Sequence, residues 1–200
     1  KTMKTPRFWL MVWSAIGSLI LVYVLIASSL KPPARGADTK PMLVGEMADF
    51  TPAFPPRPAP EIPFQSGDDM ITLQDFRGQV VLVNFRATWC APCLKELPSL
   101  DALQEKLGDQ NFKVVAIAAD PRGPEVARGF LDKLDISNLD LYSDPRLLFA
   151  AAIGGANVLP VSILYDPSGT EIGRLTGEAV WDSPEAIRLI RAVIDGREIG

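Results

Sequence analysis

The sequence predicts an α/β fold, with a mixed central sheet flanked by helices and one transmembrane helix before it. Short strand-like apolar runs alternate with helix-like runs along residues 70–200, which is typical of α/β domains. The runs 161–165 and 171–175 flank a turn-forming stretch at residues 166–169, so one hairpin makes the sheet mixed. Near the start, residues 8–30 are uncharged and mostly apolar.

The first thirty residues predict a short cytoplasmic tail, residues 1–7, and a membrane anchor, residues 8–30. As a helix the apolar stretch would be about 35 Å long, enough to cross a hydrocarbon core of about 30 Å. A cleaved signal peptide is the alternative, and Ala27, Ser28 and Ser29 resemble its cleavage site. Because a signal peptide has a shorter apolar region, about 7–15 residues, the length favours an uncleaved anchor.

The basic residues around this stretch do not orient it, because three precede it and three follow it. A very short basic N-terminus usually stays in the cytoplasm. Residues 31–63 hold nine prolines and predict a linker, since proline fixes φ and removes a backbone donor. Hydrophobic residues such as Leu43, Phe50 and Phe54 indicate that part of this linker lies against the domain, which we place at residues 64–200.

The first half of the domain centres on an apolar run, residues 80–85, interrupted only by Asn84. Such a run predicts a strand buried on both faces. A helix is predicted over residues 94–107, kinked by Pro98 and ended by Gly108, because leucines recur at helical spacing. Before the central strand we expect a short strand at residues 70–73 and a turn at residues 74–78.

The second half continues the alternation. The predicted elements are strands at 112–119 and 139–142, a helix at 124–134, a helix from Asp144 to Gly154 and Gly155, and the hairpin strands. Ser183 followed by Pro184 predicts the N-cap and first residue of a final helix.

The only two cysteines, Cys90 and Cys93, stand between the central strand and its following helix. At this spacing two thiols can form a disulfide and release it again. Cys90 would lie at the helix N-terminus, where free N–H groups and the macrodipole favour a thiolate. We therefore expect Cys90 to be the attacking nucleophile and Cys93, one turn further along the helix, to resolve the mixed disulfide.

A zinc site and a structural disulfide are the alternatives. A structural zinc needs further Cys or His ligands, and the sequence has no other cysteine and no histidine. A disulfide across two residues removes little entropy from the unfolded chain, so a structural role is disfavoured. We expect no metal and no cofactor beyond the cysteine pair itself. The net charge of −4 also argues against a nucleic-acid partner.

Residues 81–85, 87–93 and 95–98 resemble the active-site segment of the thioredoxin-like family, specifically its membrane-anchored TlpA branch with the ResA and CcmG relatives. Leu159 and Pro160 resemble the cis-proline segment of that fold. The resemblance implies a thiol–disulfide oxidoreductase, anchored in a bacterial inner membrane, with its N-terminus in the cytoplasm and its catalytic domain in the periplasm. Its substrates would be oxidised cysteines of copper-site or cytochrome oxidase assembly proteins, with cytochrome c maturation as the alternative.

The resemblance also implies roles for particular residues. Pro92 between the cysteines is similar to a reducing thioredoxin motif, and the electron donor would be a membrane thiol carrier of the DsbD type. Trp89 would shield the disulfide and offer an apolar docking surface. The backbone of Leu159, with Pro160 in the cis form, would pair with an extended segment of the substrate.

Three positions depart from the family pattern. Asn84 stands where several thioredoxins have a buried acid, and an amide cannot accept the proton of Cys93. Glu96 matches the acid that ResA-like proteins have three residues after the second cysteine, while Ala91 replaces their second glutamate. Arg86 replaces the usual aromatic residue. It either stabilises the Cys90 thiolate by its charge or forms a surface ion pair, and Glu96 either supports the pair or lies on a solvated helix face.

Three other classes are disfavoured. A Sco-type copper chaperone needs a histidine ligand that this sequence lacks. A peroxiredoxin has a threonine three residues before its reactive cysteine and a proline four residues earlier, where this chain has Ala87 and Val83. A binding module without enzymatic activity would not need both cysteines.

Overall fold

The computed structural model describes residues 13, 16–18, 23, 42–154, 158–197 and 199. The chain divides into two compact units, residues 1–40 and 41–200. In the first, the described residues are all helical. Most of the predicted transmembrane segment lies outside the described residues. Within the described part, no helix combines the length and the apolar character needed to cross a membrane.

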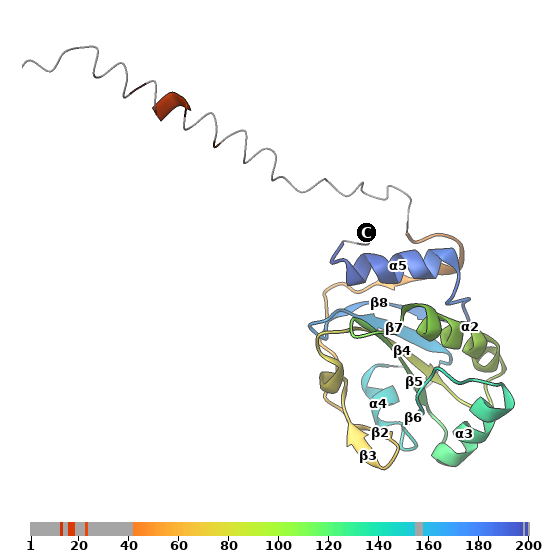
Figure 1. Ribbon diagram of the computed structural model, residues 1–200. Helices are drawn as coiled ribbons and strands as arrows, with labels where there is room; N and C mark the ends of the chain where they lie inside the picture. Colours follow the sequence, from red (N-terminus) through yellow and green to blue (C-terminus); the bar gives the residue numbers. More distant parts are fainter. Residues whose placement is uncertain are drawn as a thin grey trace, which may run out of the picture. The chain divides into compact units, whose positions relative to one another are not determined.

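The second unit is built on one mixed sheet with the strand order β1-β8-β7-β4-β5-β6-β2-β3 (Figure 1). β4 is parallel to β5 and β5 to β6, while β4–β7 and β7–β8 are antiparallel, as the predicted hairpin requires. The strands are β1 Thr51–Pro52, β2 Phe64–Ser66, β3 Asp69–Ile71, β4 Val80–Arg86, β5 Phe112–Ala118, β6 Tyr142–Ser143, β7 Val161–Tyr165 and β8 Glu171–Thr176.

Helices cover both faces of this sheet. The helices are α2 Ala91–Leu107, α3 Pro124–Lys133, α4 Leu148–Ala152 and α5 Pro184–Ile194, with 3-10 turns at η1 Gly45–Met47 and η2 Leu73–Phe76. Leu97 of α2, Leu131 of α3 and Leu189 of α5 belong to one core cluster. Phe149 of α4 belongs to the other, so α4 lies on the opposite face of the sheet (Figure 1).

Strand β4 is buried along its whole length, as predicted for residues 80–85. Leu82 packs in the core cluster that contains Leu97 of α2, here called the α2 side cluster. Val83 and Phe85 pack in the cluster that contains Phe149 of α4, here called the α4 side cluster. Successive side chains of a strand point to opposite faces, so an apolar run is needed where both faces are covered. The carboxyl end of this strand leads directly into the cysteine segment.

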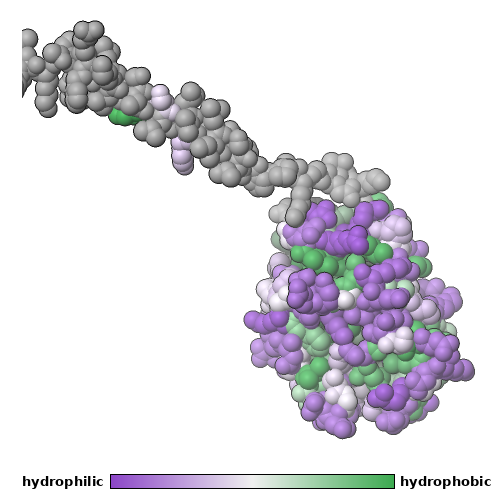
Figure 2. Space-filling view, in the orientation of Figure 1, coloured by the Kyte–Doolittle hydropathy of each residue, from purple (hydrophilic) through white to green (hydrophobic). Residues whose placement is uncertain are grey.

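The folded unit begins earlier than Phe64, where the sequence predicts the domain to start. Met47 and Phe50, within the predicted linker, are buried in the α2 side cluster, and β1 pairs with β8. A Cβ atom at Gly173 of β8 would lie 2.5 Å from the Phe50 ring, so glycine is required for this approach. On the face shown in Figure 2, hydrophilic residues cover most of the unit and hydrophobic residues appear in small patches between them.

Two predictions before β4 are confirmed with shifted boundaries. The strand at residues 70–73 is the second arm of a hairpin, β2–β3, because Gly67 adopts a positive φ of 59° in the turn. The turn at residues 74–78 is largely the 3-10 turn η2, which Thr72 and Asp75 cap reciprocally.

Two further boundaries differ after β5. Strand β6 is displaced toward Ser143, since its register is set by pairing of Tyr142 with Ile117. Helix α4 begins at Leu148 and not at Asp144, because the Asp144 carboxylate accepts the N–H groups of Leu148 and Ala150, both at 3.0 Å. The final helix is confirmed: the Ser183 hydroxyl accepts the Ala186 N–H at 3.2 Å.

Candidate active site

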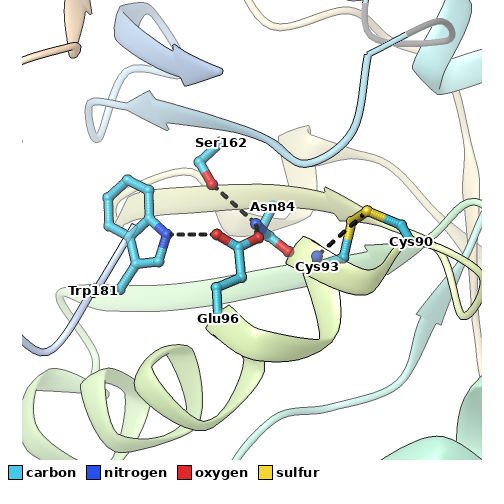
Figure 3. Close-up of a disulfide and its surroundings, with 6 residues drawn as sticks. All are labelled: Asn84, Cys90, Cys93, Glu96, Ser162 and Trp181. Atoms are coloured by element: carbon cyan, nitrogen blue, oxygen red, sulfur yellow. Dashed lines mark hydrogen bonds between the residues drawn. A yellow bond between two sulfur atoms is a disulfide. The ribbon is translucent and has the colours of Figure 1, made fainter. Parts of the chain in front are cut away.

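The cysteine segment lies at the junction of β4 and α2. Cys90 is the N-cap of α2 and is joined to Cys93 by a disulfide, with their Cα atoms 5.3 Å apart. The backbone N–H of Cys93 donates to the sulfur of Cys90 at 3.3 Å (Figure 3). After reduction, this N–H and the helix dipole would stabilise a negative charge on Cys90 more than on any sulfur deeper in the helix.

The two sulfurs differ in access. Cys90 retains 6% of its surface and Cys93 none, so Cys90 is the one that a partner can reach. Trp89 beside it is 66% exposed. Leu159 packs against Cys90 and Cys93, and the Leu159–Pro160 peptide bond is cis, which confirms the prediction from the sequence.

Glu96 is a buried carboxylate one helical turn after Cys93, not part of a solvated helix face. Its Oε1 accepts the side-chain N–H of Asn84 at 2.7 Å, and its Oε2 accepts the indole N–H of Trp181 at 3.3 Å (Figure 3). Asn84 also donates to the Ser162 hydroxyl at 2.9 Å. These contacts hold the carboxylate between α2, β4 and the segment before α5.

Burial raises the pKa of Glu96 to about 7, because the charged form loses its hydration, while hydrogen bonds from Asn84 and Trp181 act in the opposite direction. Such a group exchanges a proton near neutral pH, where an acid–base catalyst is most effective. Since residues three apart on a helix are neighbours, Glu96 lies beside Cys93.

Arg86, the last residue of β4, is only 1% exposed. None of its three guanidinium nitrogens has a hydrogen-bond partner among the described residues. Burial lowers its pKa to about 10, and the negative charge of Glu96 opposes this shift. The surface ion pair considered from the sequence is therefore wrong for Arg86.

A polar cluster ties the loop before Cys90 to the end of β5. The Thr88 hydroxyl donates to the Asp120 carboxylate, and both residues are buried. Arg122 donates to Asp120 at 3.0 and 3.1 Å and to the Thr88 hydroxyl at 2.6 Å. This cluster fixes Thr88, two positions before Cys90.

Asp120 should make the stability of the fold depend on pH in the acid range. Hydrogen bonds from Arg122 are the main cause that lowers the pKa of its carboxyl to about 2, below the value of about 4 in an unfolded chain. Ionised Asp120 therefore stabilises the fold above pH 4, and this contribution is lost as pH falls toward 2. In denaturant unfolding between pH 5 and 2, we expect the wild type to lose more stability than Asp120→Asn. Parallel curves for the two proteins would contradict this.

Sequence reasoning did not assign several of these residues to the site. Asn84 stands out in the sequence as the absence of an acid, but a polar residue within an apolar strand is also a signal of a buried contact. Ser162 follows its partner Asn84 by 78 positions, and Trp181 follows its partner Glu96 by 85 positions, so no local pattern could reveal these contacts. Thr88 and Asp120 likewise meet only through the pairing of β4 with β5.

Comparisons with known proteins give a consistent result. Residues 55–171 match the family model described as AhpC/TSA. The thiol-disulfide oxidoreductase ResA of Bacillus thuringiensis subsp. konkukian is 32% identical over 117 residues, which cover 54% of this chain and 61% of that protein. The thiol:disulfide interchange protein HelX of Rhodobacter capsulatus is 32% identical over 125 residues, covering 61% of this chain and 62% of HelX.

A solved structure gives the same fold. The crystal structure of a DsbF homologue from Corynebacterium diphtheriae has a TM-score of 0.58 and 29% identity, covering 74% of this chain and 90% of that one. The matches to ResA and HelX span only about three fifths of the length of those curated relatives.

Proposed function

Because the chain belongs to the AhpC/TSA family of thioredoxin-like proteins, we propose that it is a thiol–disulfide oxidoreductase that works through Cys90 and Cys93. The observation that carries this proposal is the asymmetry of the pair. Cys90 is the N-cap of α2 and keeps some accessible surface, while Cys93 is fully buried one turn before a carboxyl group whose pKa is near neutral. A purely structural disulfide needs neither feature.

In the first step, the Cys90 thiolate attacks one sulfur of a substrate disulfide. A new S–S bond forms between Cys90 and the substrate, the substrate disulfide breaks, and its second sulfur leaves as a thiolate that takes up a proton. The N–H of Cys93, which donates to the Cys90 sulfur at 3.3 Å, favours the attacking thiolate.

In the second step, Cys93 resolves the mixed disulfide. The Glu96 carboxylate accepts the thiol proton of Cys93, and the Cys93 thiolate attacks the sulfur of Cys90. The Cys90–substrate bond breaks, the substrate sulfur leaves with its electron pair, and Glu96 returns the proton to it. Asn84 and Trp181 orient the carboxylate during both transfers.

A peroxidase is the second candidate because the matched family model bears the AhpC/TSA description. The residues around Cys90 do not favour it, since Ala87 and Val83 provide neither a hydroxyl nor a turn where a peroxidase has threonine and proline. Thr88 is engaged with Asp120 and Arg122 and does not replace that threonine.

The test compares two substrates of the purified full chain, with dithiothreitol as reductant. We expect catalysed reduction of insulin disulfides and no consumption of hydrogen peroxide above the uncatalysed rate. Peroxide turnover without insulin reduction would instead assign a peroxidase.

Trp89 offers an apolar surface for the substrate segment next to Cys90. Replacing it with alanine removes about 1–2 kcal/mol of docking energy, so the KM for insulin should rise roughly tenfold with little change in kcat. Met70→Ala is the matched control, because Met70 is 54% exposed but belongs to β3 at the sheet edge. Equal KM values for the Trp89 variant and wild type would contradict docking at this side chain.

The finer assignment rests on the resemblance to the TlpA branch. We propose a reductase held by residues 8–30 in a bacterial inner membrane, with residues 41–200 in the periplasm. Its partners would be cysteine-bearing proteins of copper-site, cytochrome oxidase or cytochrome c assembly, and a membrane thiol carrier of the DsbD type would supply electrons. Carbonate-resistant sedimentation of the full chain with membranes tests the anchor. Recovery of a mature chain that lacks residues 8–30 would contradict it.

A further inference from the structure

Arg86 carries a buried charge that the mechanism above does not use. The guanidinium is 1% exposed, and its nitrogens have neither a hydrogen-bond nor an ion-pair partner in the part of the chain that the structure describes. Burying an uncompensated charge is costly, and buried cations are normally paired. A buried guanidinium without hydrogen-bond partners lowers the stability of the fold, so its presence needs an explanation, such as a role at a functional site.

The register of β4 and α2 places Arg86 beneath the cysteine pair. Asn84 lies opposite Glu96, since their side chains are hydrogen-bonded at 2.7 Å. Arg86 points to the same face as Asn84, about 6.6 Å further toward the carboxyl end of the strand. Cys93 precedes Glu96 by one turn, about 5 Å toward the helix N-terminus. Because α2 returns antiparallel to β4, both displacements have the same direction, and Arg86 lies opposite Cys93.

The chain after Arg86 leads directly to the cysteine pair. Ala87, the next residue, belongs to the same small buried cluster as Cys90 and Cys93. Burial leaves the pKa of Arg86 at about 10, so the guanidinium is a cation at neutral pH. The register therefore assigns to the level of Cys93 a buried positive charge whose donors have no hydrogen-bond partner among the described residues.

We propose that Arg86 sets the reduction potential of the Cys90–Cys93 pair by stabilising the negative charge that appears on the sulfurs when the disulfide is reduced. This inference rests on the proposed function. Reduction breaks the S–S bond with two electrons from a dithiol, here dithiothreitol, whose own sulfurs form a disulfide. Its two protons pass to the cysteines, or one remains in solution when a cysteine stays as the thiolate.

The direction of the effect follows from the charges. The disulfide is neutral and is stabilised little by a nearby cation. The thiolate is negatively charged, and a nearby cation stabilises it strongly because the dielectric constant of a buried site is low. Arg86 therefore favours the reduced form and makes the pair more oxidising than the same pair beside an apolar side chain.

The experiment equilibrates the full chain with mixtures of reduced and oxidised dithiothreitol at pH 7 and measures free thiols by alkylation. In Arg86→Met the equilibrium constant for reduction should fall about tenfold, which is about 30 mV for a two-electron couple. Arg86→Lys keeps the charge and should stay within about threefold of wild type. Oxidised Arg86→Met should unfold at the same or higher denaturant concentration, because a buried charge without hydrogen-bond partners among the described residues is removed.

An unchanged potential in Arg86→Met, or equal shifts in the Met and Lys variants, would overturn the inference. If Arg86→Met does not fold, Arg86→Gln is measured in the same way with the same criteria. Failure of the proposed function itself looks different: the wild type would then neither exchange with dithiothreitol reversibly nor reduce insulin.

Discussion

Replacing Cys90 with serine should reduce insulin turnover to the uncatalysed rate, whereas Cys93→Ser should stop after one step and accumulate a mixed disulfide. Cys90 is the accessible sulfur at the N-terminus of α2, so without it no attack on a substrate disulfide occurs. Cys93 is fully buried and acts only on the sulfur of Cys90. Non-reducing electrophoresis after incubation with insulin measures both results.

The two serine variants are matched controls for each other. They change one atom each at positions three residues apart and lose the same disulfide, so a difference between them reports the roles of the sulfurs. A stable mixed disulfide on Cys93 in the Cys90→Ser protein would reverse the assigned roles.

Glu96→Gln should lower kcat for insulin by roughly a hundredfold, the usual size of a general-base contribution. Glutamine keeps the shape and can still accept from Asn84 or Trp181, but it cannot take the proton of Cys93. Because the pKa of Glu96 is about 7, the wild-type rate of mixed-disulfide resolution should rise with pH through neutrality. In the glutamine variant this step of the pH profile should disappear.

Glu178→Gln is the control for charge without proton transfer. Glu178 lines the same pocket of about 580 Å³ as Glu96, and its charge contributes to the raised pKa of Glu96. Its neutralisation should move the midpoint of the pH profile to lower pH and keep the maximal rate. A Glu96→Gln enzyme with the wild-type rate and pH profile would show that the proton leaves Cys93 by another path.

The elements nearest the site were predictable because their signals are local. An uncharged apolar run predicts that β4 is buried on both faces. Leucines at helical spacing predict α2, and Ser183 with Pro184 predicts the start of α5. The cysteine spacing at a strand–helix junction indicates the chemistry.

The remainder depended on contacts between distant residues. Proline-rich residues 41–63 contain little periodic pattern, and contacts with distant parts of the chain attach them to the fold, among them the pairing of β1 with β8 and the burial of Met47 and Phe50. Glu96 and Arg86 each allowed a buried and an exposed interpretation. Which one holds is decided by α2 lying across β4 and by Trp181 closing over the carboxylate, and neither feature is encoded near those residues.

The reduction potential of the Cys90–Cys93 pair in the full chain tests the central claim most directly. Equilibration with dithiothreitol mixtures at pH 7, followed by mass spectrometry of alkylated thiols, gives this value. We predict one reversible two-electron transition at a potential above about −300 mV, the range of catalytic and labile disulfides. A pair that remains oxidised below about −300 mV would be a structural disulfide and would contradict the account.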